Sequence, residues 1–390
     1  MKTKLCIAIM AALLTTGGVA YGQGNFLKQL GSKVAKEVVN NVKSGVKNGN
    51  NQSSNNTKYE QRSAIEPKQQ VEKPKSTNKQ LFPVTSNTYR NPIVIEETDS
   101  KIDFEINGVG YSANRLDHTC TVLGPEYDYI KKLKEVTIVE SILYNNLVYK
   151  VTSIKPSAFH KEVLTSVTFP QTLEKIGDGA FSYSRLAGTV VIPGSVKYLG
   201  SACFEGSNIT KVVFESGLAT PDIRNEAFEN CKCLEEVKLP VSVKDLGDFC
   251  FQNNIALKKV SLPTNITTLS RNIFANCTAL ESITIPNSVV TIEQNAFSGC
   301  GLREAFIPEG VKRIDDSAFN GSKISMLFLP KSVEKIGQWA FSECKNLKYV
   351  SIPIRFKDAL TIVEIFDNNN PNLVHTSGNP DDWKAFHWIE

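Results

Sequence analysis

The stretch that decides the fold reads Cys277-Thr-Ala-Leu280-Glu-Ser-Ile283-Thr-Ile285-Pro286, and it is followed by Val289, Ile292 and Ala296-Phe297. Because side chains alternate across a strand, the spacing of Leu280, Ile283 and Ile285 predicts a short strand with one apolar face. Pro286 ends this strand, since proline has no N–H to donate to a neighbouring strand. The later apolar residues are expected to turn the chain back inward, with Phe297 filling the far side of a coil.

The same unit recurs along much of the chain. A phenylalanine, usually preceded by alanine, marks each copy at intervals of 22 to 24 residues: Phe159, Phe181, Phe204, Phe228, Phe251, Phe274, Phe297, Phe319 and Phe341. Prolines keep the same step at Pro170, Pro193, Pro240, Pro263, Pro286, Pro308, Pro330 and Pro353, with Ser216 at the one gap. A fixed period in the low twenties is the signature of a solenoid. The sequence therefore predicts an α/β repeat fold, rich in β-structure, with about nine coils of 22–24 residues and short parallel strands.

The repeat resembles the BspA-like leucine-rich repeats of bacterial surface and secreted proteins. The shared pattern is C-x-x-L-x-x-V/I-x-I/L-P, then V-x-x-I-G and A-F, as in Cys344 to Pro353 and Val333 to Phe341. The resemblance covers about residues 151–353. It implies a curved parallel β-solenoid that binds protein, often in adhesion, and it implies no reaction and no cofactor. The segment from Asp103 to Ile154 is similar to the strand-rich N-terminal cap of that family.

Composition and motifs divide the chain into six segments. We expect a signal peptide at 1–22, an amphipathic basic helix at 23–47, a flexible linker at 48–100, an N-terminal β cap at 101–150, leucine-rich repeats at 151–353 and a C-terminal cap at 354–390.

The first segment has the features of an export signal. Lys2 and Lys4 precede an apolar run of about ten residues, and Ala20-Tyr21-Gly22 is a small-residue cleavage pattern. The run is too short to span a bilayer, and no later stretch approaches about 18 uncharged apolar residues. The sequence predicts an exported protein, at the cell surface, secreted or in the periplasm.

The next segment is basic. Residues 23–80 hold eleven basic residues against four acidic ones. Apolar residues recur every four positions at Phe26, Leu30, Val34, Val38, Val42 and Val46. This spacing predicts one amphipathic helix. The helix is either a weakly stable part of a tether, or it contacts a membrane, the envelope or a partner through residues 26–46. The Asn-, Gln- and Ser-rich stretch after it predicts a linker.

Catalytic and metal-binding patterns are absent from the sequence. The four histidines form no H-E-x-x-H, and no G-x-S-x-G or phosphate-binding glycine loop occurs. Cys231-Lys-Cys233 lacks zinc spacing, and the stretch Asp367–Asn372 lacks the glycine and glutamate of a calcium loop. We therefore expect no enzyme activity, no metal site and no cofactor.

Most cysteines of the mature chain occupy fixed repeat positions. Cys231, Cys277, Cys300 and Cys344 each lie three residues after a repeat phenylalanine, and Cys203 and Cys250 replace the alanine before it. These positions favour reduced, buried cysteines that fill small spaces in the coils. A disulfide between Cys277 and Cys300, which occupy the same column in adjacent coils, stays open as the alternative.

Side-chain alternation also predicts which repeat residues face solvent. One outward column contains Ser166, Thr189, Lys211, Glu236, Lys259, Ser282, Glu304, Met326 and Tyr349. The other contains Thr168, Val191, Val213, Lys238, Ser261, Thr284, Phe306, Phe328 and Ser351. The middle of the first column alternates in charge and is expected to pair with itself. Near the C-terminal end of the two columns, Phe306, Met326, Phe328 and Tyr349 form a predicted aromatic patch.

Two interpretations of the aromatic patch compete. The tail 354–390 folds back over it as a cap, through Trp383, Phe386 and Trp388, or the patch binds a partner. We take the second as the hypothesis for recognition.

The sequence thus predicts a non-catalytic protein-binding module, for adhesion or surface recognition of a host or bacterial protein rather than a nucleic acid. A structural envelope protein anchored by its basic N-terminal segment is the alternative. The ligand and the oligomeric state are not written in the sequence.

Overall fold

The computed structural model describes residues 83–125, 133–217, 219–366 and 385–390. Contacts divide the chain into two units, Met1–Lys75 and Ser76–Glu390, and every described residue belongs to the second. The predicted signal peptide, the predicted basic helix and residues 48–82 of the predicted linker lie outside the described residues. The prediction of a flexible linker is wrong for residues 83–100, which contain two strands, Thr88–Tyr89 and Ile93–Glu97, that pair with other strands. Within the described ranges, no helix is long and apolar enough to cross a membrane.

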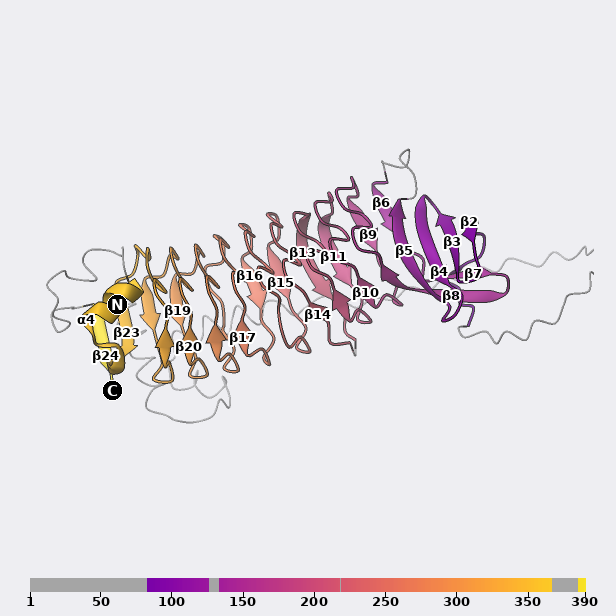
Figure 1. Ribbon diagram of the computed structural model, residues 1–390. Helices are drawn as coiled ribbons and strands as arrows, with labels where there is room; N and C mark the ends of the chain where they lie inside the picture. Colours follow the sequence, from indigo (N-terminus) through magenta and orange to yellow (C-terminus); the bar gives the residue numbers. More distant parts are fainter. Residues whose placement is uncertain (1–82, 126–132, 218, 367–384) are drawn as a thin grey trace, which may run out of the picture. The chain divides into compact units, whose positions relative to one another are not determined.

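A strand-rich cap precedes the repeats (Figure 1). Its strands are β1 (Thr88–Tyr89), β2 (Ile93–Glu97), β3 (Lys101–Ile106), β4 (Val109–Asn114), β5 (Thr119–Pro125), β7 (Ser141–Tyr144) and β8 (Leu147–Ile154). Strands β2 to β5 pair antiparallel in chain order, and β8 then pairs parallel with β5. Strand β8 also pairs with β10 of the repeats, so cap and coils share one ten-stranded sheet.

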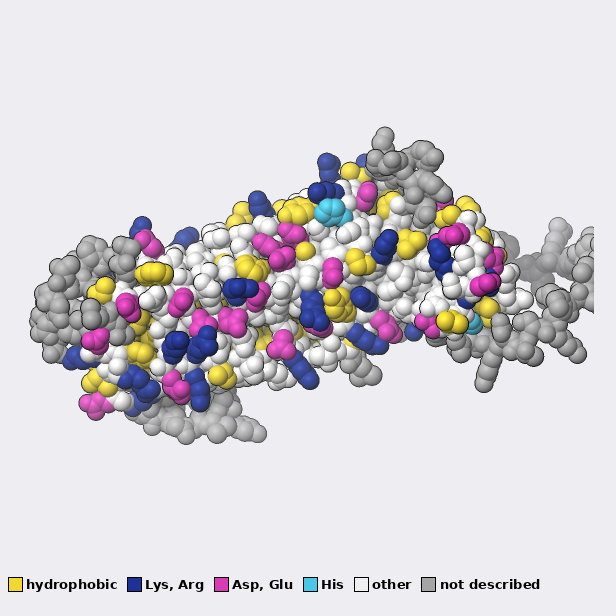
Figure 2. Space-filling view, viewed as in Figure 1, with side chains coloured by type: hydrophobic (Ala, Val, Ile, Leu, Met, Phe, Trp, Pro, Cys, Tyr) yellow, Lys and Arg dark blue, Asp and Glu magenta, His cyan; other side chains and the backbone are white. Residues whose placement is uncertain are grey.

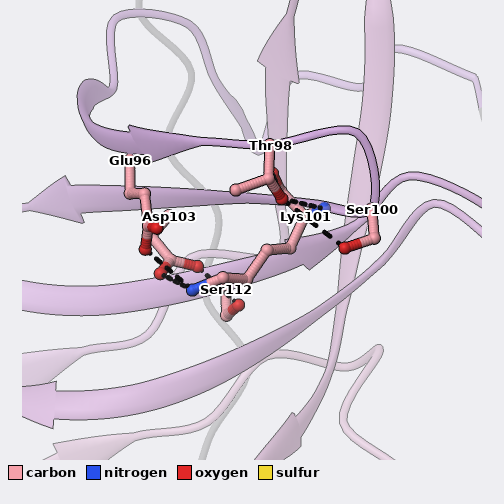
Figure 3. A network of polar contacts seen from close by, with 6 residues as sticks. All are labelled: Glu96, Thr98, Ser100, Lys101, Asp103 and Ser112. Carbon is pink, nitrogen blue, oxygen red and sulfur yellow. Dashed lines mark hydrogen bonds and ion pairs between the residues drawn. The ribbon is translucent and has the colours of Figure 1, made fainter.

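A polar network fixes the hairpin of β2 and β3 (Figure 3). Lys101 Nζ donates to Glu96 Oε2 at 2.9 Å and to Asp103 Oδ2 at 2.6 Å, and Ser112 Oγ donates to the other oxygen of Asp103 at 2.6 Å. Thr98 Oγ1 closes the turn by bonding the backbone N–H and C=O of Lys101. Asp103 is buried, and a buried carboxylate needs such partners because desolvating an unpaired charge is costly.

Each coil carries up to two short strands, which form two columns along the repeats (Figure 1). The first column contains β6 (Glu135–Thr137), β9 (Ser166–Thr168), β11 (Ala187–Ile192), β13 (Asn208–Phe214), β15 (Glu236–Lys238), β16 (Lys259–Ser261), β19 (Glu304–Phe306), β21 (Met326–Phe328) and β23 (Tyr349–Pro353). The second contains β10 (Lys175–Ile176), β12 (Tyr198–Leu199), β14 (Asp222–Ile223), β17 (Thr268–Leu269), β18 (Thr291–Ile292), β20 (Arg313–Ile314) and β22 (Lys335–Ile336). The printed pairings within these columns are all parallel, as the sequence predicts.

Two details of the first column differ from expectation. The column begins at β6, inside the segment predicted as cap, where Leu133, Val136 and Ile138 repeat the apolar spacing of the coils. The short strand predicted from Leu280, Ile283 and Ile285 is wrong, because residues 280–285 have no strand pairing, although Ile285 is buried and its neighbour Thr284 is exposed. Apolar spacing decides which side chains point inward, but not whether two backbones approach closely enough to hydrogen-bond.

The repeat phenylalanines form a continuous stack through the core. Adjacent rings from Phe159 to Phe341 lie 5.0–5.7 Å apart with interplanar angles of 3–19°. Each of these rings is at most 1 % exposed. Offset stacking of this kind adds to the burial of apolar surface. The stack continues into the C-terminal cap, where Phe366 lies 5.6 Å from Phe341.

The chain curves around each phenylalanine through two residues in the left-handed region. In one coil these are Asn272 (φ 57°) and Asn276 (φ 60°), two positions before and after Phe274. The N–H groups of these three residues all donate to carbonyls of the next coil, at 2.7–3.0 Å. Asparagine tolerates this conformation better than most residues, and its side chains also bond from coil to coil. The N–H groups of these turn residues therefore point toward the C-terminal end of the repeats.

The C-terminal cap accepts hydrogen bonds from the N–H groups at the end of the repeats. It contains the 3-10 helix η2 (Ile354–Phe356), α4 (Ala359–Phe366) and β24 (Phe386–Ile389). The N–H groups of Trp339 and Phe341 in the last coil donate to the carbonyls of Glu364 and Ile365, at 2.6 and 3.1 Å. The last carbonyls of a helix have no partner within the helix, so α4 supplies the acceptors that the final coil needs.

Candidate binding surface

The pairing register places the predicted patch on one sheet, β19-β21-β23-β24. Glu304 lies opposite Met326, which lies opposite Tyr349, and Phe306 lies opposite Phe328 in the neighbouring position. Their buried neighbours Ala305, Leu327 and Val350 point into the core. Alternation therefore turns the four patch side chains to the outer face of the sheet, as the sequence predicts.

The middle of the same face is charged. Lys211 Nζ lies 3.1 Å from Glu236 Oε2, and Glu236 lies opposite Lys259 in the next strand. Lys211, together with Lys259, lowers the pKa of the Glu236 carboxyl. Similar pairs link other coils, and charged side chains of both signs are interspersed on the face shown in Figure 2. Because these charged side chains pair with one another, we do not expect a partner protein to bind in this part of the face.

The patch itself is a row of rings. Phe306 is 48 % exposed, and its ring lies 4.9 Å from that of Phe328, with an angle of 7° between the planes. Tyr349 continues the row at 5.4 Å from Phe328, and His387 of β24 follows at 6.5 Å from Tyr349. Met326 is half-buried beside them. The structure thus brings the four predicted residues together as neighbours across three strands.

The tail lies beside this row where it is described. Strand β24 pairs parallel with β23 and extends the sheet by one strand. Phe386 is buried against Phe366, at 5.4 Å between centroids, and Trp388 packs on the core at half exposure. Trp383, the third residue expected to cover the patch, lies outside the described residues. The described tail caps the end of the coils and leaves Phe306 exposed.

Two residues differ from the predicted columns. Ser351 was expected to face solvent, but it is buried, because β24 lies along β23 and places His387 opposite it. His387 was not among the predicted patch residues. The only signal for it is the short apolar alternation around Phe386 and Trp388, which is too brief to distinguish a strand from a turn.

A comparison with known families decides the classification. The profile described as the BspA type leucine-rich repeat region matches residues 152–281 and 269–370, in six copies. These ranges span more than half of the 390 residues. The chain belongs to the BspA-type leucine-rich repeat family. No curated protein matches it.

Solved structures of leucine-rich repeat proteins resemble this BspA-type chain. A leucine-rich repeat protein from Bacteroides ovatus shares 24 % identity over 66 % of this chain and 74 % of its own, with a TM-score of 0.50. The pneumococcal vaccine antigen PcpA shares 21 % identity over 65 % of this chain and 88 % of its own, with a TM-score of 0.37. The first likeness supports the solenoid fold and nothing further.

The cysteines of this BspA-type solenoid bond to the backbone. Cys231, Cys277 and Cys344 each donate from Sγ to the carbonyl of the repeat phenylalanine one coil earlier, at 3.2 Å. Burial raises the pKa of Cys231 to about 12 and that of Cys344 to about 11, which keeps both thiols protonated. Of the eight cysteines in the described ranges, all have free thiols and seven are buried. The column thus ties adjacent coils together.

Other chemical candidates are not assembled in the described part of this BspA-type chain. There, no group of three or more His, Cys, Asp or Glu side chains is placed to hold a metal ion. Cys231 is buried, whereas Cys233 is exposed, so the two thiols of the short motif do not share one environment. The stretch 367–372, weighed as a calcium loop, lies outside the described residues.

Proposed function

We propose that this chain is a non-catalytic protein-binding module that acts outside the cytoplasm, at the cell surface or after secretion, in adhesion or surface recognition. The observation that carries the proposal is the aromatic row led by Phe306, which is 48 % exposed at one end of a face whose middle is charged. Burying apolar surface releases about 25 cal/mol per Å². Contiguous exposed aromatics are therefore typical of contact sites.

Two further observations support the proposal. The BspA-type repeats account for more than half of the chain, and the sequence begins with the features of an export signal. Recognised catalytic motifs are absent from the sequence. The ligand class we expect is a host or bacterial surface protein, since the patch combines aromatic anchors with a surrounding polar rim.

The test compares variants of the full mature chain in capture of purified bacterial and host surface proteins. The Phe306→Ser, Phe328→Ser double variant should lose at least about tenfold in affinity, as expected for the central anchors of an interface. Its thermal midpoint should change little, because both side chains point outward.

Val191→Ser is the matched control, since Val191 occupies the same column and is 41 % exposed. Undiminished capture by the double variant would overturn the proposed site. A large fall in its thermal midpoint would instead show that the two rings belong to the core of the cap.

A further inference from the structure

The rings of the aromatic patch present their edges, not their faces, to a ligand. Phe306 and Phe328 stack on each other with only 7° between their planes, so their faces are already in contact. Tyr349 lies 5.4 Å from Phe328 with 41° between the ring planes, so this pair is tilted rather than stacked. A sugar that binds by stacking on a ring needs a free face. Ring edges instead pack against aliphatic or aromatic side chains, which favours a protein ligand.

The spacing of the rings fits an α-helical ligand better than an extended one. Successive centroids from Phe306 through Phe328 and Tyr349 to His387 are 4.9, 5.4 and 6.5 Å apart. Residues three or four apart on an α-helix are separated by about 4.5 or 6.0 Å along its axis. Same-face residues of a strand are about 6.6 Å apart, so an extended segment loses register within the row. A helix that crosses the strands places one side chain at each ring.

The charges around the row have a direction. Glu304 and Glu309 lie within three residues of Phe306, Lys331 lies three residues after Phe328, and Lys348 and Arg355 lie within two residues of the ends of β23. All five side chains are exposed, and none of them forms an ion pair with another described residue. Arg303, next to Glu304, pairs with Glu281. The N-terminal end of a helix is positive and its C-terminal end negative. A helix is therefore best placed with its N-terminus over the glutamates and an acidic C-terminal half over the cations.

We propose that the aromatic patch binds an amphipathic α-helix of a partner protein, laid across β19, β21, β23 and β24. Apolar side chains at i, i+3 or i+4, and i+7 contact the ring edges, and the polar flanks are basic in the first half and acidic in the second. The inference rests on the proposed function and adds the shape, polarity and direction of the ligand.

The test uses the full mature chain and three labelled synthetic peptides of about 18 residues, roughly five helical turns. The first has leucines at helical spacing, lysines in its N-terminal half and glutamates in its C-terminal half. The second exchanges the positions of lysines and glutamates. The third keeps the composition but alternates leucine with polar residues as in a strand. Fluorescence anisotropy measures binding, and circular dichroism measures the helix formed on binding.

The first peptide should bind at least about tenfold more tightly than the other two, and it should gain helix on binding. Phe306→Ser should remove this preference, and Val191→Ser should keep it. The Lys331→Glu, Lys348→Glu double variant should reduce or reverse the difference in affinity between the first two peptides. Nonspecific hydrophobic binding does not predict this change.

Equal or tighter binding of the strand-spaced peptide would overturn the inference in favour of an extended ligand. Absence of binding by all three peptides would overturn it as well. The proposed function would survive either result if capture of surface proteins still depended on Phe306 and Phe328. It would fall only if that capture were also insensitive to the double serine variant.

Discussion

Glu229 shows how the repeats bring like charges together at the scale of single residues. It lies one position after the repeat phenylalanine Phe228, and Glu205 holds the same position one coil earlier. Partial burial, followed by the charges of Glu205 and Glu226, raises the pKa of the Glu229 carboxyl to about 7. Coil stacking therefore places a carboxylate where its ionised form is disfavoured near neutral pH.

This pKa shift predicts a pH-dependent gain from Glu229→Gln. A carboxyl whose pKa is raised from 4.5 to about 7 binds more protons in the folded state, so the free energy of unfolding falls as pH rises through that window. Removing the carboxylate should stabilise the chain at pH 8 by about 1 kcal/mol, a value reduced for solvent screening, with little effect at pH 5. Urea unfolding at the two pH values measures the difference.

The control is Glu235→Gln, because Glu235 is exposed and pairs with Lys258 at 3.0 Å. That variant should change stability by only a few tenths of a kcal/mol, and in the destabilising direction. An equal gain from Glu229→Gln at pH 5 and pH 8 would show that shape, rather than charge, is the cause.

At the scale of elements, the final coil depends on a strand from the end of the chain. Strand β24 covers the edge of β23, buries Ser351 and places Phe386 against Phe366. Deleting 386–390 should expose Val350, Ile352 and Phe366 and lower the stability of the last coil by about 2–3 kcal/mol, the value of one buried aromatic side chain. Dye binding to exposed apolar surface and hydrogen exchange of β23 measure the loss.

His387→Ala serves as the comparison, since that side chain is exposed while the strand that carries it stays intact. It should leave hydrogen exchange of β23 unchanged. If the deletion also leaves β23 protected, β24 contributes no stability and the cap is α4 alone.

The repeats were predictable from the sequence, whereas the elements that form the cap at their C-terminal end were not. Twenty-two to twenty-four residues per coil and strict alternation fix which side chains point in or out, so Phe306 and Phe328 were placed correctly. The tail has no second copy to compare with. The pairing of β24 with β23 depends on contacts between segments more than thirty residues apart, which local pattern does not contain. The strand predicted over 280–285 failed for a related reason, because the spacing of apolar residues does not determine how closely two backbones approach.

At the scale of the whole set of described repeats, each coil is stabilised by the coils on either side of it. Each phenylalanine contacts the rings before and after it, and the turn around it donates N–H groups to the next coil. Other N–H groups, such as those of Gly247 and Lys312, donate to the coil before. Such an array approximates a one-dimensional system, in which each unit is stabilised by its neighbours. A defect in the middle should therefore weaken the coils on both sides, while a defect at the end affects only the end.

Phe251→Ala tests this coupling. Phe251 is fully buried, 5.6 Å from Phe228 and 5.7 Å from Phe274, so its removal should cost about 3–5 kcal/mol and leave a gap in the stack. Hydrogen exchange should accelerate most from β15 to β17 and decline with distance, while β3, β4 and β5 of the cap stay protected. Phe366→Ala, at the end of the stack, should accelerate exchange only in the last coil and α4. Uniform acceleration of every described strand by Phe251→Ala would mean that the repeats and the cap unfold as one unit, and the one-dimensional description would then be wrong.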